Sequence, residues 1–137
     1  MRLTRHTDYA LRVLLQAAAE PGRRLSIADV AQTHGISKNH AMKVVNELAR
    51  HGYLATVRGR GGGFGLGRAP EDIRLGEVVR LTEPELQAAD CAQCVLRSGC
   101  GLTPVLAEAM AAFLAVLDAQ TLADAVRASN WPGVVRA

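Results

Sequence analysis

Three cysteines lie within ten residues of one another, and they are the only cysteines in the chain of 137 residues. They are Cys91, Cys94 and Cys100, in the stretch DCAQCVLRSGC, so their spacing is C-x2-C-x5-C. Thiolates are the ligands that soft metal ions and iron–sulfur clusters prefer. A complete coordination shell usually needs four ligands, and the four histidines all lie in the N-terminal half of the sequence. A fourth ligand must therefore come from a distant segment or from a partner chain.

Three kinds of chemistry fit this cysteine pattern. Structural zinc is one, although the second paired motif of most zinc sites is absent. A thiol–disulfide switch through Cys91 and Cys94 is another, although no thioredoxin-like βαβ context surrounds the pair. An iron–sulfur cluster is the third. The choice among them depends on what the rest of the chain does.

We expect no signal peptide or membrane span at the N-terminus. Charges at Arg2, Arg5, Asp8 and Arg12 interrupt it, so it holds neither an apolar signal core nor about 20 consecutive apolar residues. We therefore expect a cytoplasmic protein that makes no membrane contact. In the reducing cytoplasm, an odd number of clustered cysteines favours metal or redox chemistry over structural disulfides.

The two halves of the chain differ in charge. Residues 1–70 carry eleven Lys/Arg against four Asp/Glu, whereas residues 71–137 carry five against nine. The formal net charge is +3 and the sequence pI is near 9.1. A basic N-terminal half is typical of a nucleic-acid-binding surface, although it can also be a solubilising surface.

The basic half contains a predicted helix-turn-helix. Apolar spacing predicts a first helix over Thr7–Ala19, and Ser26 can cap a second helix that stops at Gly35. Ser37 can cap a third helix over Lys38–Arg50 after a very short turn. On a helical wheel the third helix has one apolar face and one polar face that is rich in amides and basic groups, as a helix for the DNA major groove requires. An ordinary amphipathic surface helix is the alternative for this segment taken alone. The polar face carries Asn39, His40, Lys43, Asn46, Glu47 and Arg50.

A glycine-rich hairpin follows the third helix. Tyr53–Val57 and Phe64–Leu66 are short β-like runs joined by RGRGGG, whose arginines are Arg58 and Arg60. The glycines do not fit a phosphate-binding loop, because neither a Lys-Ser/Thr pair nor a helix follows in register. A hairpin directly after a helix-turn-helix is a wing. We expect base-edge contacts from Asn39, His40, Lys43 and Asn46, and contacts to phosphate or the minor groove from Ser37, Lys38, Arg58 and Arg60.

The acidic half predicts a connector and an association helix. A short helix is expected over Leu75–Leu81, and a longer one begins near Pro104. This helix carries an apolar seam and is longer and more apolar than one small domain needs for its own core, which favours a homodimer. The alternative is that it packs onto its own winged helix. Thr121 and Asp124 predict a capping box for a last short helix. The seam consists of Leu102, Leu106, Ala109, Phe113 and Val116.

Three segments carry a family resemblance. The opening MRLTRHTDYALRVLL, the run SKNHAMKVVNELARHGYLATVRGRGGGFGLGR and the end LAVLDAQTLADAV are similar to the bacterial winged-helix iron–sulfur regulators, and in particular to their NsrR-like, nitric-oxide-sensing branch. The likeness extends from Met1 to about Val126. IscR-like members of the family have a histidine shortly after the last cysteine, and this chain has Gly101 to Pro104 there.

The resemblance implies a homodimeric repressor with one iron–sulfur cluster per subunit, bound by Cys91, Cys94 and Cys100. It also implies that Asp8 of the partner subunit supplies a fourth ligand. Asp8 can alternatively be an acidic residue that favours a helix N-terminus. The family usually spaces its first two cysteines further apart than the two residues found here. The resemblance also leads us to expect a 4Fe–4S rather than a 2Fe–2S cluster, an inverted-repeat double-stranded DNA operator, and nitric oxide as the signal that releases it.

The sequence therefore predicts a mainly α-helical protein with a small β-hairpin wing, built as a winged helix-turn-helix plus a long dimerisation helix. It contains no Ser/His/Asp, Cys/His or paired-carboxylate set, so we expect a transcriptional repressor and not an enzyme. The alternatives are a thiol–disulfide-responsive or zinc-stabilised winged-helix regulator, and a metal-stabilised structural or protein-interaction module. The expected parts are a DNA-binding domain over 1–70, whose first helix also contacts the dimer partner, a connector and cysteine loop over 71–101, two helices over 102–128, and a loose tail over 129–137.

Overall fold

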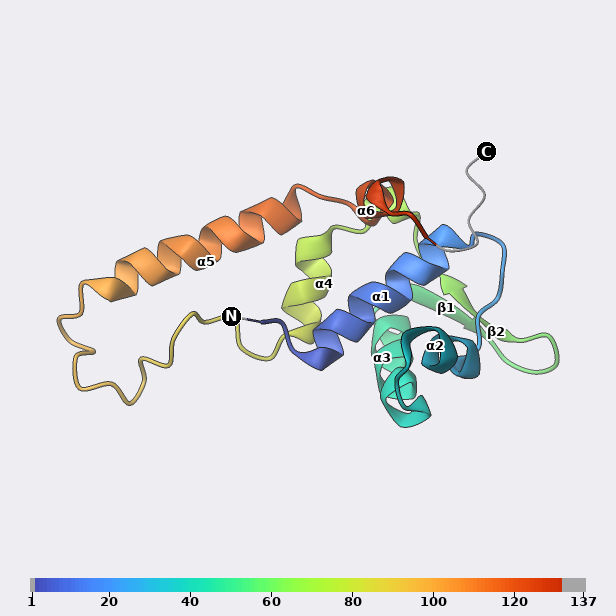
Figure 1. Ribbon diagram of the computed structural model, residues 1–137, viewed down its shortest axis with the longest axis horizontal. Helices are drawn as coiled ribbons and strands as arrows, with labels where there is room; N and C mark the ends of the chain where they lie inside the picture. Colours follow the sequence, from blue (N-terminus) through green and yellow to red (C-terminus); the bar gives the residue numbers. More distant parts are fainter. Residues whose placement is uncertain (1, 132–137) are drawn as a thin grey trace.

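The computed structural model describes residues 2–131. A body of short helices and one hairpin occupies one side of the molecule, and the long helix α5 extends away from it (Figure 1). The expected tail lies partly outside the described residues, at 132–137. In chain order the elements are α1 (Arg5–Ala19), α2 (Ile27–His34), α3 (Lys38–Arg50), β1 (Leu54–Val57), β2 (Gly63–Leu66), a 3-10 turn η1 (Pro70–Asp72), α4 (Leu75–Thr82), α5 (Leu102–Asp118) and α6 (Leu122–Ala128).

Local capping sets the ends of the helix-turn-helix. Ser26 and Asp29 form a complete capping box at the start of α2, which ends at Gly35 with φ of 64°. The Ser37 side chain accepts a hydrogen bond from the backbone N–H of His40 at 3.1 Å and so begins α3. The predicted caps at Ser26 and Ser37 and the predicted end at Gly35 are confirmed. The expected start of the first helix at Thr7 is wrong, because the Thr4 side chain accepts from the Thr7 N–H and α1 already begins at Arg5.

The wing is held by a third extended segment that the sequence did not indicate. Strands β1 and β2 pair antiparallel, with Leu54 opposite Leu66 and Val57 opposite Gly63. Leu25 pairs with Phe64 on the other side of β2, through N–H···O bonds of 2.9 and 2.8 Å between their backbones. The chain between α1 and α2 therefore fixes the base of the wing.

Gly63 is required where this third segment meets the hairpin. Its φ is 145°, and a Cβ there would lie 2.5 Å from the backbone oxygen of Leu25. We expect Gly63→Ala to lower the free energy of unfolding by about 2 kcal/mol, because the clash involves backbone atoms that cannot rotate away. Urea denaturation measures it, and Gly65→Ala is the matched control since a Cβ at Gly65 meets nothing within 4 Å. Equal midpoints for the two variants would contradict the described pairing.

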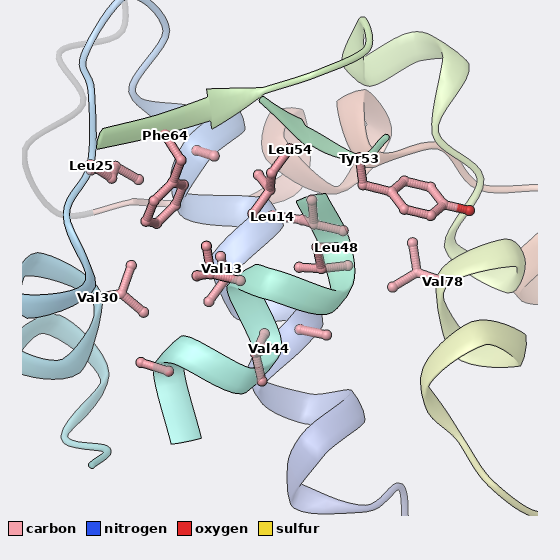
Figure 2. Close-up of a cluster of buried hydrophobic side chains, with 14 of the residues drawn as sticks. Val13, Leu14, Leu25, Val30, Val44, Leu48, Tyr53, Leu54, Phe64 and Val78 are labelled. Atoms are coloured by element: carbon pink, nitrogen blue, oxygen red, sulfur yellow. The ribbon is translucent and has the colours of Figure 1, made fainter. Parts of the chain in front are cut away.

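One hydrophobic core lies between α1, α3, the hairpin and α4. Leu14 of α1 and Leu48 of α3 are fully buried and meet Leu54, while Phe64 points down from β2 into the same cluster (Figure 2). Val78 of α4 closes the side near Tyr53 (Figure 2). Residues beyond the winged helix therefore complete its core. These later residues are Ile73, Val78 and Leu122.

Helix α5 stands apart from this core. It lies wholly within the described range and none of its residues is buried; Leu102, Val105 and Val116 are 65%, 58% and 66% exposed. Its main contacts are with α4, and the Arg80 guanidinium donates to both Asp118 carboxylate oxygens, at 2.5 and 2.8 Å. A Cβ at Gly76 would collide with the Asp118 carboxylate, so a larger residue there would force the Arg80–Asp118 pair to shift.

Across residues 2–131, no helix combines the length and apolar character needed to span a bilayer.

Candidate functional site

Helix α3 presents an exposed polar face opposite its buried face. Asn39, Lys43 and Asn46 are all exposed, and one helical turn separates each from the next along the helix. Amide and ammonium groups at this spacing can reach base edges and phosphates in a major groove. The residues that pack α3 onto the core, and so aim this face outward, are Ala41, Val44, Val45 and Leu48.

Two further groups of candidate DNA contacts are exposed, one at the start of α3 and one in the loop of the wing. Ser37 and Lys38 are exposed at the start of α3, where the Ser37 hydroxyl also serves as the helix cap. Arg58 and Arg60 are exposed in the loop between β1 and β2. The structure thus places these four residues where an anion could approach them.

Arg24 supports the wing loop from outside the hairpin. Its Nη1 donates to the backbone oxygen of Gly61 at 3.0 Å, across 37 residues of sequence. This contact fixes the loop that carries Arg58 and Arg60. Sequence reasoning missed Arg24 because no local pattern links it to the wing.

His40 differs from the other candidates on α3, because its ring lies against α1. It is half-buried and meets Tyr9 edge-on, with ring centroids 4.7 Å apart. The His6 ring lies nearly parallel to it at 5.9 Å. Burial lowers the pKa of His40, and the charges of His6, Lys43 and Arg5 lower it further. His40 is therefore neutral around pH 7.

Asp8 lies in the first turn of α1 and is engaged within its own helix. Its carboxylate accepts two hydrogen bonds from the Arg12 guanidinium, at 2.9 and 2.8 Å. The pair is largely exposed, so it contributes little to stability. Asp8 remains accessible to a second chain at this surface.

A carboxylate from the connector secures the start of α1. Glu83, at the end of α4, accepts from the Thr4 backbone N–H at 3.2 and 3.1 Å and from the Thr7 hydroxyl at 2.5 Å. The turn that carries Asp8 is therefore tied to the segment that leads into the cysteine loop. A separation of 79 residues between Thr4 and Glu83 hides this contact from sequence analysis.

The three cysteines are free thiols in the loop before α5. Cys94 is exposed, and Cys91 and Cys100 are half-buried. The backbone N–H of Leu102 and the side chain of Thr103 hydrogen-bond the Cys100 sulfur and lower the pKa of that thiol. Open apolar space beside Cys91 is lined by Leu86, Leu106 and Met110. The loop can therefore present thiolates at the edge of an apolar surface.

The donor set fits an iron–sulfur cluster in its chemistry. None of the three sulfurs takes part in a disulfide, and such clusters require thiolate ligands. Within residues 2–131, however, no three His, Cys, Asp or Glu side chains converge as they would around a metal ion. A bound cluster therefore requires the loop to close around it, with a further donor from outside the loop.

Comparison with known proteins agrees with this architecture. The family model Rrf2, described as an iron-dependent transcriptional regulator, matches residues 3–128. The HTH-type transcriptional regulator NsrR of Bacillus subtilis is 52% identical over 133 residues, covering 93% of this chain and 91% of that protein. The protein of the same name from Bacillus licheniformis is 47% identical over 132 residues, covering 92% of each chain.

A solved structure gives the same fold. CymR of Bacillus subtilis, titled a global cysteine regulator, matches with a TM-score of 0.77 over 95% of this chain and 99% of that chain, at 23% identity. The expected winged-helix fold, mainly helical with a small hairpin, is confirmed. The curated relatives are named as transcriptional regulators and not as enzymes. The chain belongs to the Rrf2 family of DNA-binding transcriptional regulators.

Proposed function

We propose that this regulator is a homodimeric repressor that binds an inverted-repeat operator while it holds an iron–sulfur cluster, and releases the operator when nitric oxide attacks the cluster. The proposal places the protein in the cytoplasm. One observation carries it: three free thiols lie in the loop that leads to α5. This apolar helix lies within the described residues and has no buried residue of its own.

The DNA-binding part of the proposal is supported by the exposed groups of α3 and the wing. Asn39, Lys43 and Asn46 would read base edges in the major groove. His40, predicted from the sequence as a fourth reader, would instead support this face, because its ring packs against Tyr9 of α1. Ser37, Lys38, Arg58 and Arg60 would contact phosphates or the minor groove. The two sets of residues lie on α3 and on the hairpin that follows it in the chain. A single surface that contacts a duplex needs both sets.

The dimer is supported by α5. Leu102, Val105 and Val116 are exposed on a helix whose own chain covers only part of it. An exposed apolar face of this kind marks an association surface. A second copy packed along α5 would bury this face, and a dimer that binds two half-sites one turn of DNA apart needs its two α3 helices about 34 Å apart.

Cys91, Cys94 and Cys100 would hold the cluster, with Asp8 of the partner subunit as a fourth ligand. When bound, the cluster would supply iron–thiolate bonds that nitric oxide can break. To act as a ligand, Asp8 must leave the Arg12 guanidinium, which its exposed position permits. The Glu83 contacts to Thr4 and Thr7 would then transmit a shift of the loop to α1.

A native mass spectrum of protein isolated without oxygen tests the cofactor. We expect a dimer that carries iron and sulfide in the ratio of one 4Fe–4S cluster per chain. A 2Fe–2S mass would correct the cluster type alone. Zinc, or a bare chain two hydrogens lighter, would replace the proposal by a structural metal or a disulfide switch.

The wing has a separate test. We expect Arg60→Ala to weaken binding to all duplexes alike and to reduce the slope of log K against log[salt] by about one, because one phosphate contact is lost. Fluorescence anisotropy at several salt concentrations measures the slope. Arg74→Ala removes an exposed arginine outside the winged helix and serves as the matched control. An unchanged slope for Arg60→Ala would contradict the assignment of the wing to DNA.

A further inference from the structure

His6, in the first turn of α1, contacts helix α3 at two separate places. Its Nε2 is hydrogen-bonded to the carboxylate of Glu47, in the last turn of α3. Its ring also stacks on that of His40, in the first turn of α3, with an interplanar angle of 13°. One α1 side chain thus contacts α3 at two points that lie seven residues apart.

The positions of His40 and Glu47 make these contacts restrictive. The two residues are seven apart, which is two helical turns and about 10 Å along the axis, on the same side of α3. The buried side chains of α3 set its position on the core, and contacts in both its first and last turns restrain its tilt and rotation more closely than a contact at one end would. Tyr9, also on α1, meets the His40 ring edge-on and limits its movement further.

The environment of these contacts favours their persistence. The side chains of His6 and Glu47 are only 30% and 23% exposed, so water competes less for their hydrogen bond than at an open surface. His6 donates through its ring N–H and Glu47 accepts. Burial lowers the pKa of His40 and so favours the neutral form of the ring that packs here.

We propose that His6 is a positioning residue for sequence recognition: without touching DNA, it fixes the orientation in which α3 presents Asn39, Lys43 and Asn46 to the bases. This inference rests on the proposed entry of α3 into the major groove. Base-edge hydrogen bonds require well-aligned donors and acceptors, whereas phosphate contacts carry no sequence information. Loss of His6 should therefore reduce specific binding and spare non-specific binding.

The test uses full-length protein isolated without oxygen. Wild-type protein first selects a preferred duplex from a pool of random 30-base-pair duplexes, and a scrambled duplex of the same composition reports non-specific binding. We expect His6→Ala to lower the affinity ratio between these duplexes about tenfold, the equivalent of one base contact. Affinity for the scrambled duplex and the salt slope should not change.

Two conservative variants separate the two contacts. His6→Gln keeps an N–H donor for Glu47 but loses the ring, and His6→Phe keeps a ring for His40 but loses the donor. We expect each to restore part of the ratio. His51→Ala is the matched control, because the His51 ring bonds the Glu47 backbone oxygen of its own helix, at 3.0 Å, rather than a residue of α1, and we expect it to keep the wild-type ratio.

The other outcomes are distinct. Lys43→Ala tests the entry of α3 into DNA by itself. If Lys43→Ala lowers the ratio and His6→Ala does not, the positioning role is overturned and the proposed function stands. If no duplex is selected and Lys43→Ala has no effect, the proposed function fails and takes this inference with it. If His6→Ala lowers both affinities equally together with the melting temperature, its role is structural and the inference is overturned.

Discussion

Replacing Cys94 by alanine is expected to reduce bound iron from one cluster per chain to less than about a tenth of that, because a thiolate ligand is lost from a site with few donors. The fold should survive. Cys94 is exposed and lies in a loop outside the hydrophobic core, so its side chain contributes no buried packing. Metal analysis of protein prepared without oxygen measures the loss.

The control for this variant must separate metal loss from unfolding. Ser98→Ala changes another exposed side chain of the same loop and should keep the iron. The melting temperature of Cys94→Ala should match that of wild-type protein from which iron has been removed by a chelator. A variant that unfolds globally would instead mean that the metal is structural, as in small zinc domains.

Leu48→Ala should lower the free energy of unfolding by about 3 kcal/mol, within the range of about 2–5 kcal/mol for a buried leucine. Leu48 is fully buried where α3 meets the hairpin, beside Leu54 (Figure 2). The deletion leaves a cavity that the surrounding backbone segments cannot fill. Urea denaturation at a fixed chain concentration measures the change.

Leu96→Ala provides the matched control. Leu96 is 63% exposed in the cysteine loop, so its truncation should change stability by less than about 0.5 kcal/mol. Similar midpoints for the two variants would show that α3 is not anchored as described. The comparison also tells whether a loss of DNA binding in any α3 variant arises from the fold or from the contact surface.

The elements that sequence predicted well are those determined by neighbouring residues. Ser26 with Asp29 and Thr121 with Asp124 form the capping boxes that set the starts of α2 and α6, and both partners lie within one turn. Glycines placed the hairpin loop in the same way. Apolar spacing alone places the start of α1 at Thr7, which is wrong because the polar Thr4 caps the helix and Arg5 is its first residue.

Contacts between distant segments could not be predicted. Arg24 reaches Gly61, and Glu83 reaches Thr4, only because the folded core brings their backbones together. The contact between His6 and Glu47 is also one between distant segments, and nothing in the sequence near His6 indicates it. Residue types alone assign chemistry to a position, but tertiary packing decides which positions meet.

For the cysteine site, too, sequence indicates the local part and leaves open the part that depends on distant segments. Spacing and residue type identified Cys91, Cys94 and Cys100 as a thiol cluster, and their closeness in sequence required no fold. Their convergence on a single point depends on loop closure and on a donor from elsewhere, which sequence spacing does not determine. The ligand roles of these residues and of Asp8 remain predictions.

The attachment of α5 at one end makes it a lever. The Arg80–Asp118 pair lies at its C-terminal end, next to the body, while its N-terminal end carries the cysteine loop far from the winged helix (Figure 1). Seventeen residues give an arm of about 25 Å. A rotation of about 5° at the pivot moves the far end by about 2 Å, roughly the length of an iron–sulfur bond. Conversely, a displacement of one bond length at the thiols turns the whole arm by only a few degrees. A chemical change at the loop therefore reaches α4 as a rotation of only a few degrees.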